Sequence, residues 1–248
     1  MMSYIDDRVG DLLDALSASG FADNTMVIFT SDHGDMIGER GMWFKKTLFE
    51  QAIRVPMIIR YPHSSASGVK QTPVTLVDLL PTCLRAAGIG SSELLTDIDG
   101  EDLVQLADDT RADTRPVCIE HLDGATHAPR VMVRLARYKY VYPEAYPPQL
   151  FDLQSDPEQL DNLCGSDTHA TTEQELHALV MQRWDLPKLK SDVVSNQRIR
   201  RFLADALGKG RIEPWETEPT VSTANRFVRR GDLFPDVERH GYVDYEDC

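Results

Sequence analysis

The sequence predicts an α/β fold with a small antiparallel C-terminal subdomain, divided into residues 1–110, residues 111–210 and an extended tail over 211–248. Three observations support this prediction. A helical pattern precedes two continuous apolar runs, a second helical pattern follows them, and shorter strands joined by turns come after residue 110. Helices that flank strands with two apolar faces are typical of layered α/β domains.

The first part is predicted as helix, strand, strand and helix over residues 3–19, 25–30, about 55–60 and 75–87. The first helix has apolar residues at helical spacing, and the strands are continuous apolar runs that predict burial on both faces. Gly20 ends the first helix, and Gly88 caps the second in the manner of a helix C-terminus. Pro81 lies inside the second predicted helix and is expected to kink it.

The second part is predicted as antiparallel strands followed by helices. The strands are expected in the segments PVCIEHL, RVMVRLARYKYVY and QLFDLQSDPEQLDNL. Asp156-Pro157 is expected to open a short helix, and longer helices are predicted at about 172–184 and 190–207. The proline-containing tail has little periodicity, which leaves two alternatives: an arm that supports a homo-oligomer by lying on a neighbouring subunit, or disorder.

Composition excludes several classes of partner. The chain has 248 residues with a net charge of −14, which repels nucleic acid and anionic membrane surfaces and mildly favours a cationic small molecule. No apolar run approaches the ~20 residues needed to span a bilayer, and the N-terminus lacks the basic start of a signal peptide. The four cysteines form no C-x-x-C pair, which predicts reduced thiols in a cytoplasmic protein.

Candidate chemistry follows the first predicted strand. Asp32 and His33 stand where that strand ends, the place where α/β sheets usually bind ligands. A carboxylate and a neutral imidazole can both ligate a divalent cation, and Gly34 lets the backbone turn closely. Lys45 is within loop reach of an anion bound there, which suits transfer of a sulfuryl or phosphoryl group. The alternative is an ordinary strand-end turn followed by solvated lysines.

The amino-acid sequence of this region resembles that of a known family. The segment NTMVIFTSDHGDMIGERGMWFKKTLFEQAIRVPMIIRYP resembles type I sulfatases of the alkaline-phosphatase-like superfamily, most of all choline-sulfatases, and the likeness continues to about residue 220. The resemblance implies part of a sulfatase sandwich acting on a small-molecule sulfate ester. It implies that Asp32 and His33 ligate a divalent metal (Ca²⁺ first, with Mg²⁺ or Mn²⁺ as alternatives) and that Lys45 contacts the sulfate. Phosphonate monoester hydrolases share the Asp-His pair, so hydrolysis of a phosphonate or phosphate monoester is the alternative function.

Two expected parts of such an enzyme are missing from the sequence. Sulfatases of this type attack with a formylglycine made from Cys in a Cys-x-Pro-x-Arg segment, and none of the four cysteines has that context. The family's first acidic metal ligands also lack a counterpart. The chain is therefore expected to be a C-terminal half that is inactive alone, or a non-catalytic fragment. For the trimethylammonium group of choline sulfate, the candidate carboxylates are Glu120, Asp123 and the tail residues Asp232 and Asp236.

Overall fold

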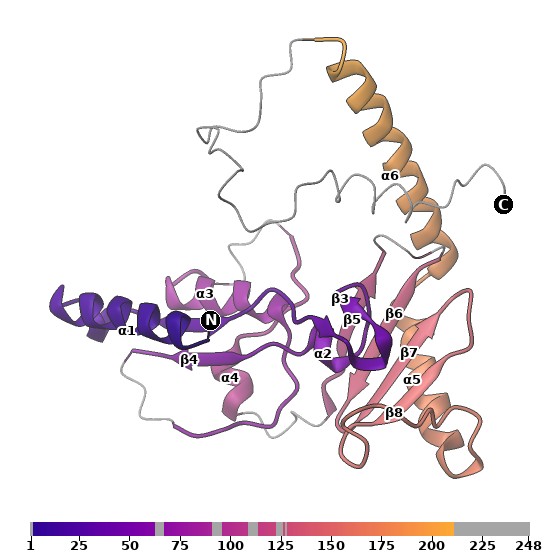
Figure 1. Ribbon diagram of the computed structural model, residues 1–248, viewed down its shortest axis with the longest axis horizontal. Coiled ribbons are helices and arrows are strands. Elements are labelled where there is room, and N and C mark those ends of the chain that lie inside the picture. The colour runs from indigo at the N-terminus through magenta and orange to yellow at the C-terminus, as the bar shows by residue number, and fades with distance from the viewer. Residues whose placement is uncertain are drawn as a thin grey trace. The chain divides into compact units, whose positions relative to one another are not determined.

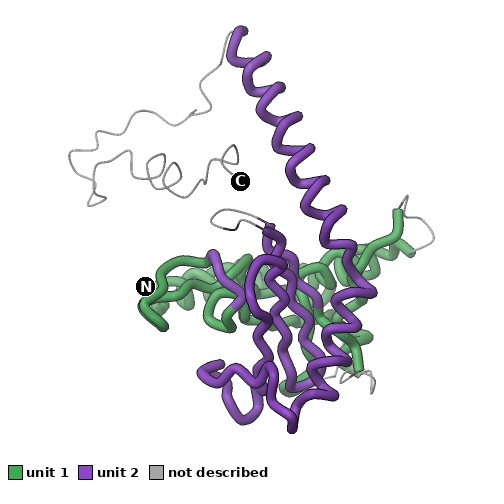
Figure 2. The backbone as a smooth tube through the Cα atoms, turned by 90° about the vertical axis from the view of Figure 1, so that its right-hand side faces the viewer, with its two compact units in different colours: residues 1–45, 49–117 green, residues 46–48, 118–248 purple. Residues whose placement is uncertain are grey.

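We describe the protein from a computed structural model, which covers residues 2–62, 67–90, 96–108, 114–122, 126 and 128–210. The chain forms two compact units (Figure 2). The first contains residues 1–45 and 49–117, and the second contains residues 46–48 and the chain from residue 118 onward. The predicted tail over 211–248 lies outside the described residues.

The first unit alternates helices with short strands (Figure 1). Its elements are α1 (Met2–Ala18), β1 (Val27–Thr30), β2 (Met36–Ile37), β3 (Trp43–Phe44), α2 (Glu50–Ile53), β4 (Met57–Arg60), α3 (Leu79–Ala86) and α4 (Leu103–Asp108). The predicted order of helix, strand, strand and helix is present as α1, β1, β4 and α3. The strand pair β2–β3 and helices α2 and α4 were not predicted.

The two apolar strands are less buried than their sequences predict. β1 pairs with β4 in an antiparallel two-stranded sheet, with Ile28 opposite Ile59. Phe29 is 39% exposed and Ile58 is 63% exposed. The prediction that these strands are covered on both faces is therefore wrong for the described chain, because Phe29 and Ile58 are exposed to solvent.

Helix α3 does not have the kink that was predicted at Pro81. It begins at Leu79, after a short 3-10 turn over Leu76–Asp78, so Pro81 is its third residue. A proline in the first turn removes an N–H that has no helical partner, and it does not interrupt the helix. The C-cap prediction is confirmed, because Gly88 has φ 76° and the Ile89 N–H donates to the Leu84 carbonyl at 2.9 Å.

Asp78 joins three segments of the first unit and is fully buried. Its carboxylate accepts hydrogen bonds from the backbone N–H groups of Thr75 (2.8 Å) and Glu101 (2.9 Å). It also accepts both ends of the Arg115 guanidinium, at 3.2 and 2.5 Å. Burial lowers the pKa of Arg115, but Asp78 and Glu101 outweigh burial and raise it. The start of α3, the segment before α4 and Arg115 are thus held by one side chain.

The second unit is a four-stranded sheet with helices, and its antiparallel strands confirm the prediction. The elements are β5 (Val117–His121), β6 (Arg130–Leu135), β7 (Tyr138–Pro143), β8 (Gln149–Asp152), α5 (Ala170–Arg183) and α6 (Leu186–Leu207). The strand order is β5-β6-β7-β8, and β7 is antiparallel to both of its neighbours. Helix α5 packs on one face of this sheet (Figure 1). The core between them contains Val131, Val133, Tyr140, Leu150, Leu176, Val180, Trp184 and Leu186.

The chain after β8 differs from its prediction. The short helix expected at Asp156-Pro157 is a turn, because the Asp156 carboxylate accepts the Asp161 N–H at 3.0 Å and Gln159 adopts φ 57°. Both features divert the backbone from helical hydrogen bonding. Helix α5 matches its predicted range. Helix α6 begins four residues before its predicted start of 190, since Asp185 caps it by accepting the Lys188 N–H at 3.0 Å.

Cysteine reactivity gives a first testable prediction. Among the described residues Cys83, Cys118 and Cys164 form no disulfide, and Cys83 is exposed. Burial, together with the Glu173 carboxylate, raises the pKa of Cys164 to about 12. Because the thiolate is the reactive form, we expect iodoacetamide at neutral pH to label Cys83 well before Cys164. Peptide mass spectrometry over a labelling time course measures this, and equal rates would contradict it.

No helix in the described ranges combines the length and the apolar character needed to cross a membrane.

Candidate active site

The loop that follows β1 holds its own side chains in place. The Ser31 hydroxyl donates to the His33 carbonyl at 2.9 Å, and the Asp32 Oδ1 accepts the His33 N–H at 3.0 Å. These local hydrogen bonds turn the chain sharply at the end of the strand. Asp32 therefore presents its second carboxylate oxygen, Oδ2, outward, with the side chain 81% exposed.

His33 is oriented by the carbonyl of the next residue. Its Nδ1 lies 2.8 Å from the Gly34 oxygen, which can only accept, so Nδ1 carries the proton in this contact. The other ring nitrogen, Nε2, lies 2.7 Å from the Lys45 Nζ and 3.2 Å from the Asp32 Oδ2. The structure thus brings together the three side chains that the sequence pattern singled out, with their polar atoms around the His33 Nε2. A carbonyl that fixes one ring nitrogen as donor leaves the other to act as a ligand.

Gly34 is required by a tertiary contact. Its N–H donates to the Ala52 carbonyl of α2 at 2.8 Å. A Cβ at this position would lie 2.0 Å from the Gln51 carbonyl oxygen, far inside van der Waals contact. The loop carrying Asp32 and His33 is therefore seated directly on α2, and only glycine fits. The sequence predicts only that Gly34 lets the backbone turn closely, and nothing local in the sequence signals its contact with α2.

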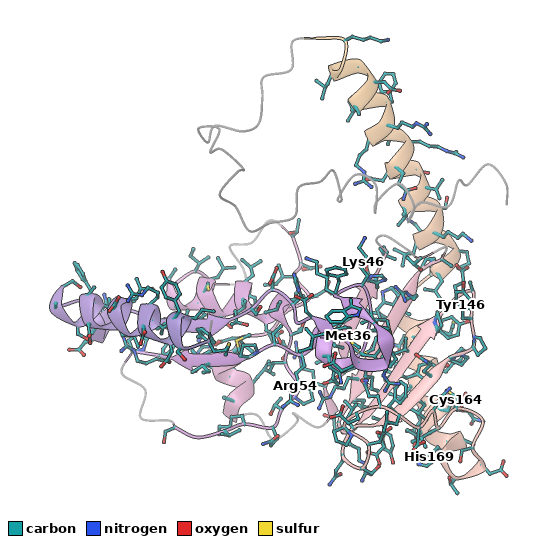
Figure 3. The ribbon with its side chains drawn as sticks, in the orientation of Figure 1. Met36, Lys46, Arg54, Tyr146, Cys164 and His169 are labelled. Atoms are coloured by element: carbon teal, nitrogen blue, oxygen red, sulfur yellow. The ribbon has the colours of Figure 1, made fainter. Side chains whose placement is uncertain are left out.

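A compact hairpin directs Lys45 toward this loop. Strands β2 and β3 pair Met36 with Phe44, and Met36 is only 1% exposed. Figure 3 labels Met36 in this hairpin. Between and beside them the backbone adopts positive φ at Gly38 (121°), Arg40 (57°) and Phe44 (69°). A bulky residue such as Phe44 rarely adopts this region, and such strain is found most often at functional positions. It turns the chain immediately before Lys45.

Electrostatics keep the Asp32 carboxylate ionised. Burial acts to raise its pKa, but the neighbouring His33, its backbone N–H and Lys45 together lower the pKa below its ordinary value. A lowered carboxyl pKa means that the ionised form, which is the form that ligates a metal, persists to lower pH than for a free aspartate.

Asp32 and His33 are suitable types of metal ligand, but two ligands are too few for a complete metal site. A carboxylate oxygen and an imidazole nitrogen are suitable ligands for Ca²⁺, Mg²⁺ or Mn²⁺, although Ca²⁺ takes about six to eight ligands in all. Within the described ranges no group of three or more His, Cys, Asp or Glu side chains is placed to hold an ion. Asp32 and His33 could therefore supply two ligands of a larger set.

Of the four candidate residues for the cationic part of a substrate, only Glu120 lies among the described residues. Glu120 lies in the second unit on β5, and its Oε1 accepts the Trp184 indole N–H at 2.6 Å. Side chains alternate along a strand, so Glu120 shares the α5-covered face of the sheet with Cys118, and His121 points to the opposite face. Asp123, Asp232 and Asp236 lie outside the described residues. The Trp184 contact spans 64 residues, and no sequence signal could have identified it.

An acid and an imidazole at a strand end, with an ammonium beside them, are groups that could together bind an anionic ester next to a divalent cation. Comparison with known proteins narrows the class. Residues 1–89 match the Sulfatase family model, and residues 191–240 match the model described as choline sulfatase enzyme C terminal. The chain belongs to the sulfatase family, as its sequence resemblance predicts.

Individual relatives agree with this assignment. The choline-sulfatase of Rhizobium meliloti (strain 1021) is 37% identical over 231 residues, which are 92% of this chain and 45% of that protein. The structure of BT4656 with its substrate D-glucosamine-2-N,6-O-disulfate has a TM-score of 0.60 and 27% identity, over 77% of this chain and 39% of that one. The phosphonate monoester hydrolase of Agrobacterium radiobacter has a TM-score of 0.63 and 26% identity, over 73% and 39%. This chain therefore spans less than half the length of each of these relatives.

Proposed function

We propose that this chain is the part of a sulfuric ester hydrolase that binds the sulfate group, with choline sulfate as the substrate. The observation that carries the proposal is the convergence of Asp32, His33 and Lys45, with the His33 Nε2 at 2.7 Å from the Lys45 Nζ. Sulfate esters are anionic and develop further charge as the ester bond breaks, so a fixed ammonium beside two metal ligands suits their hydrolysis.

Each residue has a defined part in the proposed mechanism. A bound divalent cation supplies Lewis-acid stabilisation of the sulfuryl oxygens. Asp32 and His33 would hold that cation, and the Gly34 carbonyl keeps the imidazole proton on Nδ1 so that the other ring nitrogen stays available. The Lys45 ammonium, freed from the His33 Nε2, donates to the sulfate oxygens.

The proposal that choline is the alcohol part of the substrate is supported by the relatives of this chain and by the negative charge of Glu120. A choline-sulfatase is among the relatives, and the match to the C-terminal choline sulfatase model covers residues 191–240. We propose that Glu120 attracts the trimethylammonium group, since its carboxylate is exposed and is oriented by the Trp184 indole. Asp123 is the second candidate. A phosphonate or phosphate monoester is the alternative substrate, favoured by the likeness to the Agrobacterium radiobacter hydrolase.

Binding is the most direct test, because the Cys-x-Pro-x-Arg nucleophile segment is absent from these residues and we propose that the chain alone releases no sulfate from choline sulfate. We expect Lys45→Met to weaken choline sulfate binding in the presence of Ca²⁺ by about tenfold or more in isothermal titration calorimetry, as expected for loss of a charge-assisted hydrogen bond.

The neighbouring Lys46→Met is the matched control for charge, because Lys46 is equally exposed and directly follows Lys45. Equal losses in both variants would show that only net charge matters and would overturn the assignment of Lys45. Release of sulfate by the wild-type chain, abolished by Lys45→Met, would overturn the proposed inactivity. Tighter binding of a phosphonate monoester than of choline sulfate would favour the alternative. A cytoplasmic location and self-association through the tail stay predictions.

A further inference from the structure

Among the described residues, Arg130 of the second unit has no acidic partner of the kind that a half-buried arginine usually has. Its Nη2 donates to the His121 Nδ1 at 2.7 Å and, more weakly, to the Lys46 carbonyl at 3.4 Å. Its Nε is buried and has no hydrogen-bond partner in the described chain. Neither contact brings a negative charge, although the protein carries 40 acidic residues. A buried guanidinium without a counter-charge is unfavourable, so this environment favours an anion.

Two other partly buried arginines of this protein have carboxylate partners. Arg115 is paired with Asp78 and Glu101, and Arg137 is paired with Asp152. Burial lowers the pKa of Arg130, whereas the carboxylates around Arg115 raise the pKa of that residue. The difference is a missing carboxylate at Arg130 in the part of the chain that the structure describes.

Several groups surround this position at the end of the sheet where β6 begins. Lys46 and Tyr146 lie toward that end (Figure 3), and Tyr146 follows β7, whose Pro143 is opposite Arg130 in the ladder. Glu144 is the nearest acid in the register, but its Oε2 is buried and without a hydrogen-bond partner, and it forms no ion pair with Arg130 among the described contacts. His121 accepts at Nδ1, so the imidazole aligns the guanidinium without neutralising it.

We propose that Arg130 and His121 form a binding site for a small oxyanion at the start of β6. The ligand class is a sulfate, a phosphate or a carboxylate, because a planar guanidinium binds such groups through paired N–H donors. The site lies in the second unit and uses neither Asp32, His33 nor Lys45, so it goes beyond the proposed function and can be tested separately from it.

The test uses the full chain with Lys45→Met, which silences the proposed sulfate contact. In this background the arginine Nε–Hε signals are followed by ¹H–¹⁵N NMR during titration with sodium sulfate, with sodium chloride at equal ionic strength as control. We expect one arginine signal to shift saturably with sulfate, and that signal to be missing from the spectrum of Arg130→Lys. Parallel titrations with phosphate and acetate distinguish a tetrahedral oxyanion from a carboxylate.

Two further variants keep the result interpretable. His121→Gln should weaken sulfate binding about tenfold while retaining the Arg130 signal, since it removes the group that aligns the guanidinium. Glu144→Gln should leave the affinity unchanged or increase it, because it removes a nearby negative charge. Shifts that grow linearly with salt, or a saturable shift that persists in Arg130→Lys, would overturn the proposal. Loss of sulfate binding in Glu144→Gln would also overturn it, because an anion site formed by Arg130 and His121 does not need the Glu144 carboxylate.

Discussion

Gly34→Ala is expected to displace the loop that carries Asp32 and His33. The added Cβ would lie 2.0 Å from the Gln51 carbonyl oxygen, which is backbone of α2 and cannot move aside as a flexible side chain would. The hydrogen bond from the Gly34 N–H to the Ala52 carbonyl, now 2.8 Å, must lengthen as the loop moves. We expect a loss of about 2 kcal/mol in the free energy of unfolding, measured by urea denaturation, from overpacking and the weakened bond.

The same substitution should also weaken metal binding, because the loop sets the direction of both proposed ligands. Calorimetric titration with Ca²⁺ should show about 10-fold to 100-fold weaker binding, the range expected when the support of a metal ligand is lost. Gly10→Ala is the matched control, since Gly10 lies exposed in α1 with no atom near its Cβ position. It should stabilise the chain by about 0.5–1 kcal/mol. A Gly34→Ala protein with wild-type stability would disprove the seating of the loop on α2.

Asp78→Asn should be the most destabilising single change in the first unit that we predict. The hydrogen bonds to the Asp78 carboxylate in the described chain all come from donors: two backbone N–H groups and the Arg115 guanidinium. An asparagine keeps the shape but removes the charge and turns an NH₂ group toward donors. Because Arg115 is only 14% exposed, its charge would remain largely dehydrated and uncompensated. We expect a loss of about 3–5 kcal/mol in urea-induced unfolding.

Glu101→Gln provides the comparison for Asp78→Asn. Glu101 also contacts Arg115, at 2.7 Å, but its side chain is 50% exposed, so water can replace much of what is lost. Its cost should stay below about 1 kcal/mol. Similar losses in the two variants would show that the network depends on net charge and not on the buried position of Asp78.

Local patterns in the sequence were enough to predict most elements. The spacing of apolar residues predicted α1, and Gly88 marked the end of α3 through its freedom to adopt positive φ. The alternating strands of the second unit were predicted for the same reason, since each pattern depends on residues that are close in the sequence. Pro81 was misjudged because its effect depends on where the helix begins: a 3-10 turn over Leu76–Asp78 comes first, so Pro81 falls in the first turn of α3.

The sequence by itself determined the kind of site, because an acid, an imidazole and a glycine follow an apolar strand. Its similarity to sulfatase sequences indicated the family. Only the tertiary structure decided that the Lys45 Nζ meets the His33 Nε2 and that Gly34 rests on α2. It also decided that Glu120 receives the Trp184 indole and that β1 pairs antiparallel to β4. The physical reason is that these contacts join residues 12 to 64 positions apart, and which of them form depends on packing and hydrogen bonding across the folded chain.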